Sequence, residues 1–160
     1  MEKIRILMVC LGNICRSPLA QGIMEHKAKL VGLDIFVDSA GTANYHSGEH
    51  PHTSSIRVAR ENGIDISGQQ ARQFLPGDLN KFDLIYAMDS DNFENIHRIT
   101  GTNQSVQKVR LFLDESYPGE GMNVPDPWYG NYDGYLKVFD LIAANCDTII
   151  TKIKDKSLFA

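Results

Sequence analysis

Apolar residues along this chain follow two patterns that alternate from one end to the other. Some form short unbroken runs, which are typical of strands buried on both faces, whereas others recur every three or four positions, which is typical of helices packed on one side. The runs predict strands at residues 3–10, 35–39, 82–88 and 108–113. The spaced segments predict helices at residues 18–31, 53–62, 90–99 and 135–153.

Two of these helices carry further signals. Ser17 is suited to cap the first helix, Pro18 to occupy its first position, and Gly32 to end it. The last helix has apolar residues at steps of three and four, which place them on one face. These residues are Tyr135, Phe139, Ile142, Cys146, Ile149 and Ile153.

The alternation of strand and helix predicts the fold class. Repeated strand–helix–strand units pair their strands in parallel through right-handed crossovers. The sequence shows neither an internal repeat nor an interdomain linker. We therefore expect one α/β domain over residues 1–160, with a doubly wound, four-stranded parallel sheet and helices on both faces. Ligands of such sheets bind beyond the carboxyl ends of the strands, which places the segments after residues 10 and 88 at the binding edge.

Composition and charge narrow the function. The net charge is −4 and the sequence contains no Lys/Arg-rich run, so a nucleic-acid binder is disfavoured and an anionic substrate needs a local positive site. The first apolar run is too short for a membrane span or a signal peptide, which makes the cytoplasm the expected location. The three cysteines, an odd number, argue against a disulfide framework and favour chemistry for the pair in one short loop.

That loop joins the first strand to the first helix, and residues 9–18 read Val-Cys-Leu-Gly-Asn-Ile-Cys-Arg-Ser-Pro. A loop that wraps a phosphate dianion can direct several backbone N–H groups at its oxygens, and the helix N-terminus adds partial positive charge. Gly12 and Asn13 tolerate the backbone angles that such a wrap demands. Arg16 can hold two phosphate oxygens at once. The segment therefore predicts a phosphate-binding loop.

Cys10 is the candidate nucleophile of this loop. A thiolate is favoured over the thiol beside a helix N-terminus and an arginine, and the Ser17 hydroxyl can donate to the sulfur. The structural alternative is a small hydrophobic residue at the end of a buried strand. A nucleotide-binding Walker loop fits poorly without a Gly-Lys-Ser/Thr ending, and a zinc site needs more ligands than Cys10 and Cys15 supply.

The segment resembles the signature loop of the low-molecular-weight protein tyrosine phosphatases, Val-Cys-x-Gly-Asn-x-Cys-Arg-Ser-Pro, without a substitution at a defining position. Further matching motifs lie at residues 38–42, 71–73, 88–92 and 125–127. The resemblance implies hydrolysis of phosphotyrosine and small aryl phosphates through a cysteinyl phosphate, with Cys10 as nucleophile, Arg16 on the phosphate, and neither a metal nor another cofactor. The remaining residues of the phosphate-binding loop are then Leu11, Gly12, Asn13, Ile14, Cys15 and Ser17.

The reaction also needs a proton donor for the tyrosyl oxygen. By resemblance this general acid, and later base, is Asp126, which lies in the loop of residues 115–131; the alternative is a simple Asx-Pro turn. The resemblance also gives Asn13 the shaping of the loop and Ser39 the support of Asn13. It places Asp89 and Asn92 near the pocket, with helix capping as the alternative.

Aromatic side chains suit the walls of a pocket that accepts a flat phenyl ring. The resemblance points to Tyr45, Trp128 and Tyr129 as such walls, and His46 is expected to contact substrate residues that flank the phosphotyrosine. Ordinary loop packing is the alternative for the three aromatic residues. His46 also shares its loop with two further histidines, for which a metal site is conceivable but not favoured because the loop is predicted to be exposed.

Other residues carry weaker expectations. His26 and His97 are predicted on helix surfaces and Cys146 in the core. Gln69 stands where some relatives have a histidine tied to the loop asparagine. Under oxidation, Cys15 is a candidate for a reversible disulfide with Cys10.

Two other activities of the same fold compete with this interpretation. By resemblance, an arsenate reductase of this fold works as a redox relay that needs two additional cysteines in mid-chain. This chain has no cysteine between Cys15 and Cys146. By resemblance, relatives that act on phosphoarginine carry Thr at the position of Ile14. A non-catalytic phosphate-binding module would usually lack the nucleophile, the arginine or the acid.

The expected partners are phosphotyrosine proteins, with phosphate or other oxyanions in the loop, and the chain is expected to be a monomer with weak self-association.

Overall fold

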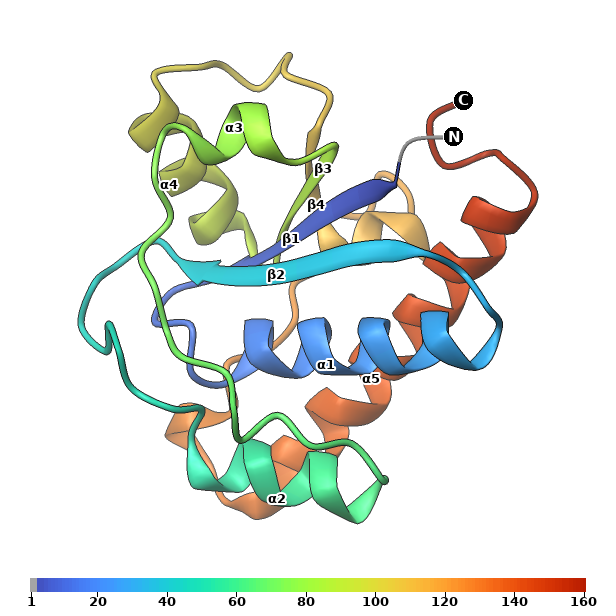
Figure 1. The fold of residues 1–160 in the computed structure, drawn as a ribbon. Coiled ribbons are helices and arrows are strands. Elements are labelled where there is room, and N and C mark those ends of the chain that lie inside the picture. The colour runs from blue at the N-terminus through green and yellow to red at the C-terminus, as the bar shows by residue number, and fades with distance from the viewer. Residues whose placement is uncertain (1–2) are drawn as a thin grey trace.

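The computed structural model describes residues 3–160, and its centre is a sheet of four parallel strands. The strands lie in the order β2-β1-β3-β4, as Figure 1 shows. Their bounds are β1 (Ile4–Cys10), β2 (Ile35–Gly41), β3 (Leu84–Ala87) and β4 (Val109–Leu111). The prediction of a doubly wound, four-stranded parallel sheet is confirmed.

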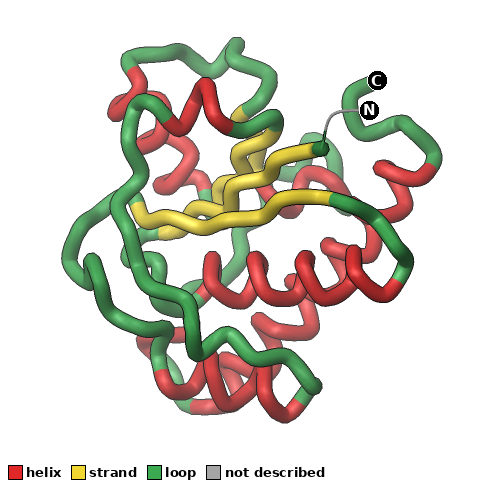
Figure 2. The backbone as a smooth tube through the Cα atoms, in the orientation of Figure 1, coloured by secondary structure: helices red, strands yellow, loops and turns green. Residues whose placement is uncertain are grey.

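Helices cover both faces of the sheet (Figures 1 and 2). On one face α1 packs directly against α5, and α2 contacts both of them; α3 and α4 lie on the other face. The bounds are α1 (Arg16–Leu30), α2 (Thr53–Glu61), α3 (Asp78–Lys81), α4 (Ser90–Thr100) and α5 (Tyr132–Lys154), with short 3-10 helices η1 (Phe112–Glu115) and η2 (Pro127–Tyr129).

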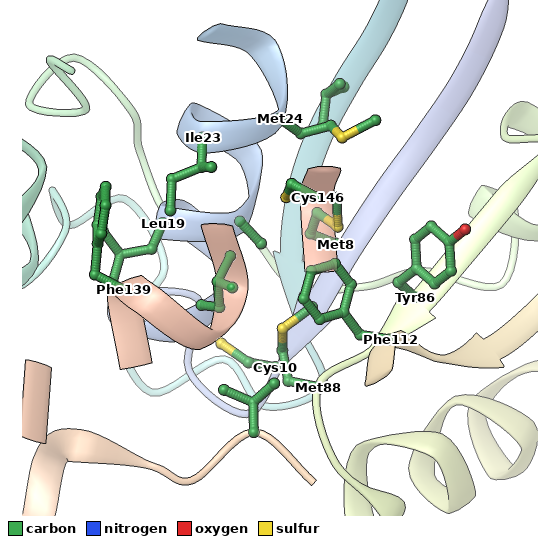
Figure 3. Packing of buried hydrophobic residues seen from close by; sticks show 14 of the residues in the cluster. Met8, Cys10, Leu19, Ile23, Met24, Tyr86, Met88, Phe112, Phe139 and Cys146 are labelled. Atoms are coloured by element: carbon green, nitrogen blue, oxygen red, sulfur yellow. The ribbon is translucent and has the colours of Figure 1, made fainter. Parts of the chain in front are cut away.

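Two hydrophobic cores result, because successive side chains of β1 point to opposite faces of the sheet. Ile6, Met8 and Cys10 belong to the larger core under α1 and α5, whereas Leu7 and Val9 belong to the smaller core on the opposite face. Figure 3 shows the larger core, which contains Leu19 and Ile23 of α1 together with Phe139 and Cys146 of α5. Cys146 is fully buried, as its place on the apolar stripe predicts.

The start of α1 differs from the prediction. The helix begins at Arg16, so Cys15 occupies the N-cap position and caps with no side-chain hydrogen bond. Ser17 is therefore not the cap, and Pro18 is the third residue of the helix instead of the first. The Ser17 hydroxyl contacts Cys10 and Asn13, so its hydrogen bonds go into the preceding loop and not to the helix end.

Two other expectations also need correction. The α3 helix has no counterpart among the predicted elements, because a four-residue helix is too short for a periodic pattern. His97 was expected on a helix surface, but it is buried, packs edge-on against Phe93 and pairs through Nδ1 with Thr102 Oγ1 at 2.9 Å. Gly101, in the left-handed conformation, turns the chain back so that Thr102 reaches the last turn of α4 and meets His97.

The carboxyl ends of β1 and β2 lie side by side, with Cys10 opposite Gly41 in the register. A Cβ atom at Gly41 would lie 2.7 Å from the Leu11 carbonyl oxygen and 3.1 Å from the Asn13 nitrogen. Both neighbours are backbone atoms of the loop after β1, which cannot rotate away as a side chain can. Gly41 is thus required for the close approach of β2 to this loop.

We predict that Gly41→Ala destabilises the protein by about 1–3 kcal/mol, the usual cost of overpacking a tight site. Urea unfolding of the two proteins checks this value. Gly68→Ala is the matched control, because no heavy atom lies within 4 Å of a Cβ at that position and its backbone does not need glycine. Equal midpoints for the Gly41→Ala and Gly68→Ala variants would contradict the close approach.

Candidate active site

The loop between β1 and α1 directs its carbonyl oxygens away from its own interior. The carbonyls of Cys10, Leu11 and Ile14 accept hydrogen bonds from the backbone N–H groups of Thr42, Ala43 and His52, at 2.8–2.9 Å. Within residues 3–160, the backbone N–H groups of residues 11–15 have no hydrogen-bond partner. A short loop with its carbonyls tied outward and its N–H groups unpaired is suited to bind an anion.

Asn13 fixes the shape of this loop. It is in the left-handed region, with φ of 58°, and its side chain bonds at both ends. The Nδ2 atom donates to Ser17 Oγ at 2.8 Å, and the Oδ1 atom accepts from the backbone N–H of Arg72 at 3.0 Å. Asparagine tolerates this backbone conformation better than most residues.

Cys10 lies at the base of the loop. Its side chain is almost fully buried, and Sγ lies 3.0 Å from Ser17 Oγ. Because Ser17 Oγ already accepts from Asn13 Nδ2, its own proton is free to point at the sulfur. The geometry therefore provides a hydroxyl donor that stabilises negative charge on Cys10 Sγ.

Cys15 has a different environment. Burial raises the pKa of its thiol to about 11, although a hydrogen bond with the Tyr135 hydroxyl acts in the opposite direction. Its Sγ atom lies 3.6 Å from Tyr135 Oη. Complete burial likewise raises the pKa of Cys146. Cys15 and Cys146 are therefore thiols at neutral pH.

Arg16, the first residue of α1, holds a buried guanidinium group. Its Nη1 atom donates to Asp89 Oδ2 at 2.6 Å and to the Val124 carbonyl at 3.0 Å, while Nη2 lies 3.7 Å from Asp126 Oδ2. Burial acts to lower the pKa of Arg16, but Cys10, Asp89 and Asp126 together raise it above the ordinary value. The group remains a cation that neighbours from three segments orient.

Asp89 combines the two roles that the sequence left open. Its Oδ1 atom caps α4 by accepting from the Asn92 N–H at 2.7 Å, and its Oδ2 atom pairs with Arg16. Asn92 is almost fully buried at the start of the same helix. Capping and pocket support are thus compatible, because the two carboxylate oxygens face different groups.

Asp126 lies in the loop before η2. Its Oδ1 atom accepts from the Trp128 N–H at 3.1 Å, which is the turn expected for an Asp-Pro segment. Its Oδ2 atom lies on the side of Arg16. The local turn therefore directs the carboxylate at the loop after β1.

These residues surround one hollow of about 190 Å³. It is lined by Cys10, Leu11, Gly12, Ile14, Cys15, Arg16, Tyr45, His46, Asp126, Trp128 and Tyr129. The structure thus brings the candidate nucleophile, cation and acid together with the three candidate wall residues and His46. The family model described as low molecular weight phosphotyrosine protein phosphatase matches residues 5–158.

The chain belongs to this phosphatase family. The phosphatase is 38% identical over 159 residues to the low molecular weight protein-tyrosine-phosphatase YfkJ of Bacillus subtilis, with 97% of this chain and 99% of YfkJ covered. The YfkJ crystal structure superposes with a TM-score of 0.89 at 36% identity, covering 98% of each chain. A protein tyrosine phosphatase from Entamoeba histolytica, solved with Hepes in its active site, gives a TM-score of 0.88 at 31% identity and covers 98% of this chain and 100% of its own.

Some predicted site residues of the phosphatase lie outside the hollow. Asn13 and Ser17 support the loop through the hydrogen bond between their side chains, and neither lines the hollow. Asp89 and Asn92 lie at the start of α4. The expectation that Ser39 supports Asn13 is wrong, because its hydroxyl donates to Gln21 Oε1 at 2.7 Å. That place is taken by Arg72, whose backbone N–H binds Asn13 and whose guanidinium contacts Asp38 and Asp78.

The histidine-rich loop is also more structured than the sequence predicts. His52 caps α2 through Nδ1, His46 Nδ1 lies 2.8 Å from Glu49 Oε2, and His50 Nδ1 lies 3.1 Å from the Gln69 carbonyl. Gln69 donates to the Pro18 carbonyl and does not contact Asn13. Residues 3–160 contain no cluster of three metal-binding side chains. None of the helices in that range combines the length and apolar character that a membrane crossing needs.

The left-handed backbone at Asn13 gives a paired prediction. Asn13→Ala and Asn13→Gly both remove the two side-chain hydrogen bonds, but only glycine adopts this backbone without strain. The Ala variant should therefore be less stable than the Gly variant by about 1 kcal/mol. Thermal unfolding of both variants measures the difference, and an Ala variant as stable as the Gly variant would exclude strain at this position.

The three cysteines should differ in reactivity. At pH 7.5, iodoacetamide is expected to alkylate Cys10, whereas Cys15 and Cys146 react only after unfolding, because burial raises the pKa of both thiols. Peptide mass mapping of the native protein identifies the labelled residue. The Cys10→Ser variant serves as control and should take up almost no label; rapid labelling of Cys15 in that variant would disprove the assignment.

Proposed function

We propose that this phosphatase hydrolyses phosphotyrosine and small aryl phosphates through a cysteinyl phosphate. Cys10 is the nucleophile, Arg16 binds the phosphate, and Asp126 is the general acid and base. One observation carries the proposal: Cys10, Arg16 and Asp126 line the same hollow, next to a loop whose N–H groups have no hydrogen-bond partner within residues 3–160.

In the first step, the phosphate lies in the loop and its oxygens accept hydrogen bonds from backbone N–H groups and from Arg16. Cys10 Sγ attacks phosphorus from one side, and the bond between phosphorus and the tyrosyl oxygen breaks on the other side. Asp126 gives its proton to the departing oxygen, so that neutral tyrosine leaves. The loop and Arg16 stabilise the charge on the equatorial oxygens throughout this step.

In the second step, water attacks phosphorus and Asp126 accepts a proton from that water. The bond between phosphorus and sulfur breaks, and Cys10 leaves as a thiolate. The Ser17 hydroxyl, 3.0 Å from Sγ, stabilises this leaving thiolate. Inorganic phosphate is released, and the starting state is restored without a metal or another cofactor in the cycle.

The rim of the hollow supports an aryl substrate. Tyr45, Trp128 and Tyr129 lie around it with exposed fractions of 73%, 47% and 84%, so flat surfaces are available to a phenyl ring. His46 lies at the same rim and is placed to contact residues that flank the phosphotyrosine. By resemblance, phosphatases that act on phosphoarginine carry a threonine hydroxyl at the position of Ile14. The side chain of Ile14 is apolar and lacks this hydroxyl, which favours phosphotyrosine.

The arrangement of cysteines disfavours arsenate reduction. Cys146 is fully buried in α5, on the face of the larger core, so it is unsuited to exchange a disulfide with Cys10. The proposal also takes residues 1–160 as one phosphatase domain that acts on phosphotyrosine proteins in the cytoplasm. Three free cysteines suit that reducing compartment. A monomer with weak self-association completes the proposal, as the family resemblance implies.

The deciding experiment measures phosphate release from a phosphotyrosine peptide in the presence of a metal chelator, for the parent and for Cys10→Ser. The parent should release phosphate, and the variant should lose activity by at least about 1000-fold, because an alcohol at this position is a far weaker nucleophile. Circular dichroism of the variant controls for folding.

Two results would contradict the proposal. Activity of Cys10→Ser close to that of the parent would exclude the cysteine mechanism. An inactive parent would exclude phosphotyrosine as substrate, and phosphoarginine and arsenate would then be assayed in the same format.

A further inference from the structure

The indole ring of Trp128 packs against two imidazole rings. The ring centroid of His52 lies 5.2 Å away with an interplanar angle of 74°, and that of His46 lies 5.9 Å away with an angle of 48°. Trp128 is the only tryptophan of the chain, and it belongs to η2, the turn that Asp126 caps. Contacts of this ring therefore bear on the position of the general acid.

His52 is itself fixed by contacts to three other elements. Its backbone N–H donates to the Ile14 carbonyl of the phosphate-binding loop at 2.8 Å. Its Nδ1 atom accepts from the Ser54 N–H at 3.0 Å, which caps α2. Its ring stacks on Tyr135 of α5, with centroids 5.3 Å apart and planes at 14°. A ring held from these directions is a rigid support for whatever packs against it.

The acid lies midway between two anchored residues. On one side, the Val124 N–H donates to the Met88 carbonyl at 2.8 Å, and the Val124 carbonyl accepts from Arg16. On the other side, Trp128 packs against His52. Among the described residues 3–160, the polar contacts of the Asp126 carboxylate are the hydrogen bond from the Trp128 N–H and the 3.7 Å approach to Arg16. Its position therefore depends on both anchors.

We propose that His52 is a positioning residue for Asp126, acting through the contact of its ring with Trp128. This inference rests on the proposed function, since it concerns the delivery of a proton to the leaving group. The competing explanation is that His52 serves only as the helix cap of α2. The two roles belong to different parts of the side chain, so substitutions can separate them.

His52→Asn removes the ring and keeps a good helix cap, because asparagine is among the preferred N-cap residues. His52→Phe does the reverse, since it keeps a flat ring and removes the capping atom. His50→Asn is the matched control: it replaces a histidine of the same loop whose side chain bonds to the Gln69 carbonyl. Asp126→Asn removes the proton donor altogether. Its loss of activity is therefore the largest that a displaced Asp126 could cause.

The assay compares kcat/KM for two substrates, a phosphotyrosine peptide and p-nitrophenyl phosphate. The tyrosine phenol has a pKa of about 10, so its departure needs a proton, whereas the much more acidic nitrophenol leaves without one. We expect His52→Asn to lower kcat/KM about 10-fold for the peptide and less than about 2-fold for p-nitrophenyl phosphate. His50→Asn should change neither value, and Asp126→Asn should show the same selectivity with a larger loss.

Trp128 fluorescence gives a readout that does not depend on activity. Acrylamide quenching should increase in His52→Asn and stay unchanged in His50→Asn, because only the former removes a ring that packs against the indole. The melting temperature of His52→Asn should remain near that of the parent. His52→Phe should melt at a lower temperature but keep the parent ratio of the two kcat/KM values.

The outcomes separate the explanations. Equal losses for both substrates in His52→Asn, or unchanged quenching of Trp128, would overturn the positioning role. A lower ratio of peptide to p-nitrophenyl phosphate activity in His52→Phe would assign the effect to the cap and overturn it as well. An inactive parent would overturn the proposed function, and the inference with it, whereas an active parent with an unaffected His52→Asn variant would overturn the inference alone.

Discussion

The outward direction of the carbonyl groups in the loop after β1 is the constraint on which the rest of the site depends. Three of these carbonyls are tied to the backbone of residues 42–52, and Gly41 lets β2 come close enough for this pairing. A loop with its carbonyls fixed outward leaves its N–H groups for an anion. The same pairing holds the start of α1 in place, and with it the buried guanidinium of Arg16.

A buried cation requires partners, and the choice of partners organises the surroundings of the hollow. Arg16 is met by the carboxylate that caps α4, by the Val124 carbonyl and by Asp126 at a longer distance. Asp89 comes from the segment after β3, whereas Val124 and Asp126 come from the segment after β4. Burial of the Arg16 charge would be costly without these partners. Arg16 therefore holds Asp89 and the loop that contains Val124 and Asp126 in fixed positions around it. The contacts that stabilise the buried Arg16 cation thus also place Asp126 beside the hollow.

The sequence predicts the strands, most helices and the loop well, because each of these depends on local patterns. Cys10, Arg16 and Asp126 are separated by up to 116 positions, yet local motifs and the family resemblance point to all three. What it misses depends on contacts that no periodic pattern reveals. Arg72, 59 positions away, rather than Ser39, supports Asn13, and His97 turns inward toward Thr102, five positions away. His52 reads only as one of three loop histidines until Tyr135 and Trp128 are seen beside it.

The partners of the loop also have a consequence for the order of folding. Asn13 is bonded to a residue 59 positions later, and Arg16 to residues 73 and 108 positions later. Contacts so distant in sequence form late, because the intervening chain must first be brought together. During synthesis on the ribosome, the nucleophile thus emerges long before its cation is paired. Competence for chemistry is acquired only after the segment up to Asp126 has been synthesised and has docked.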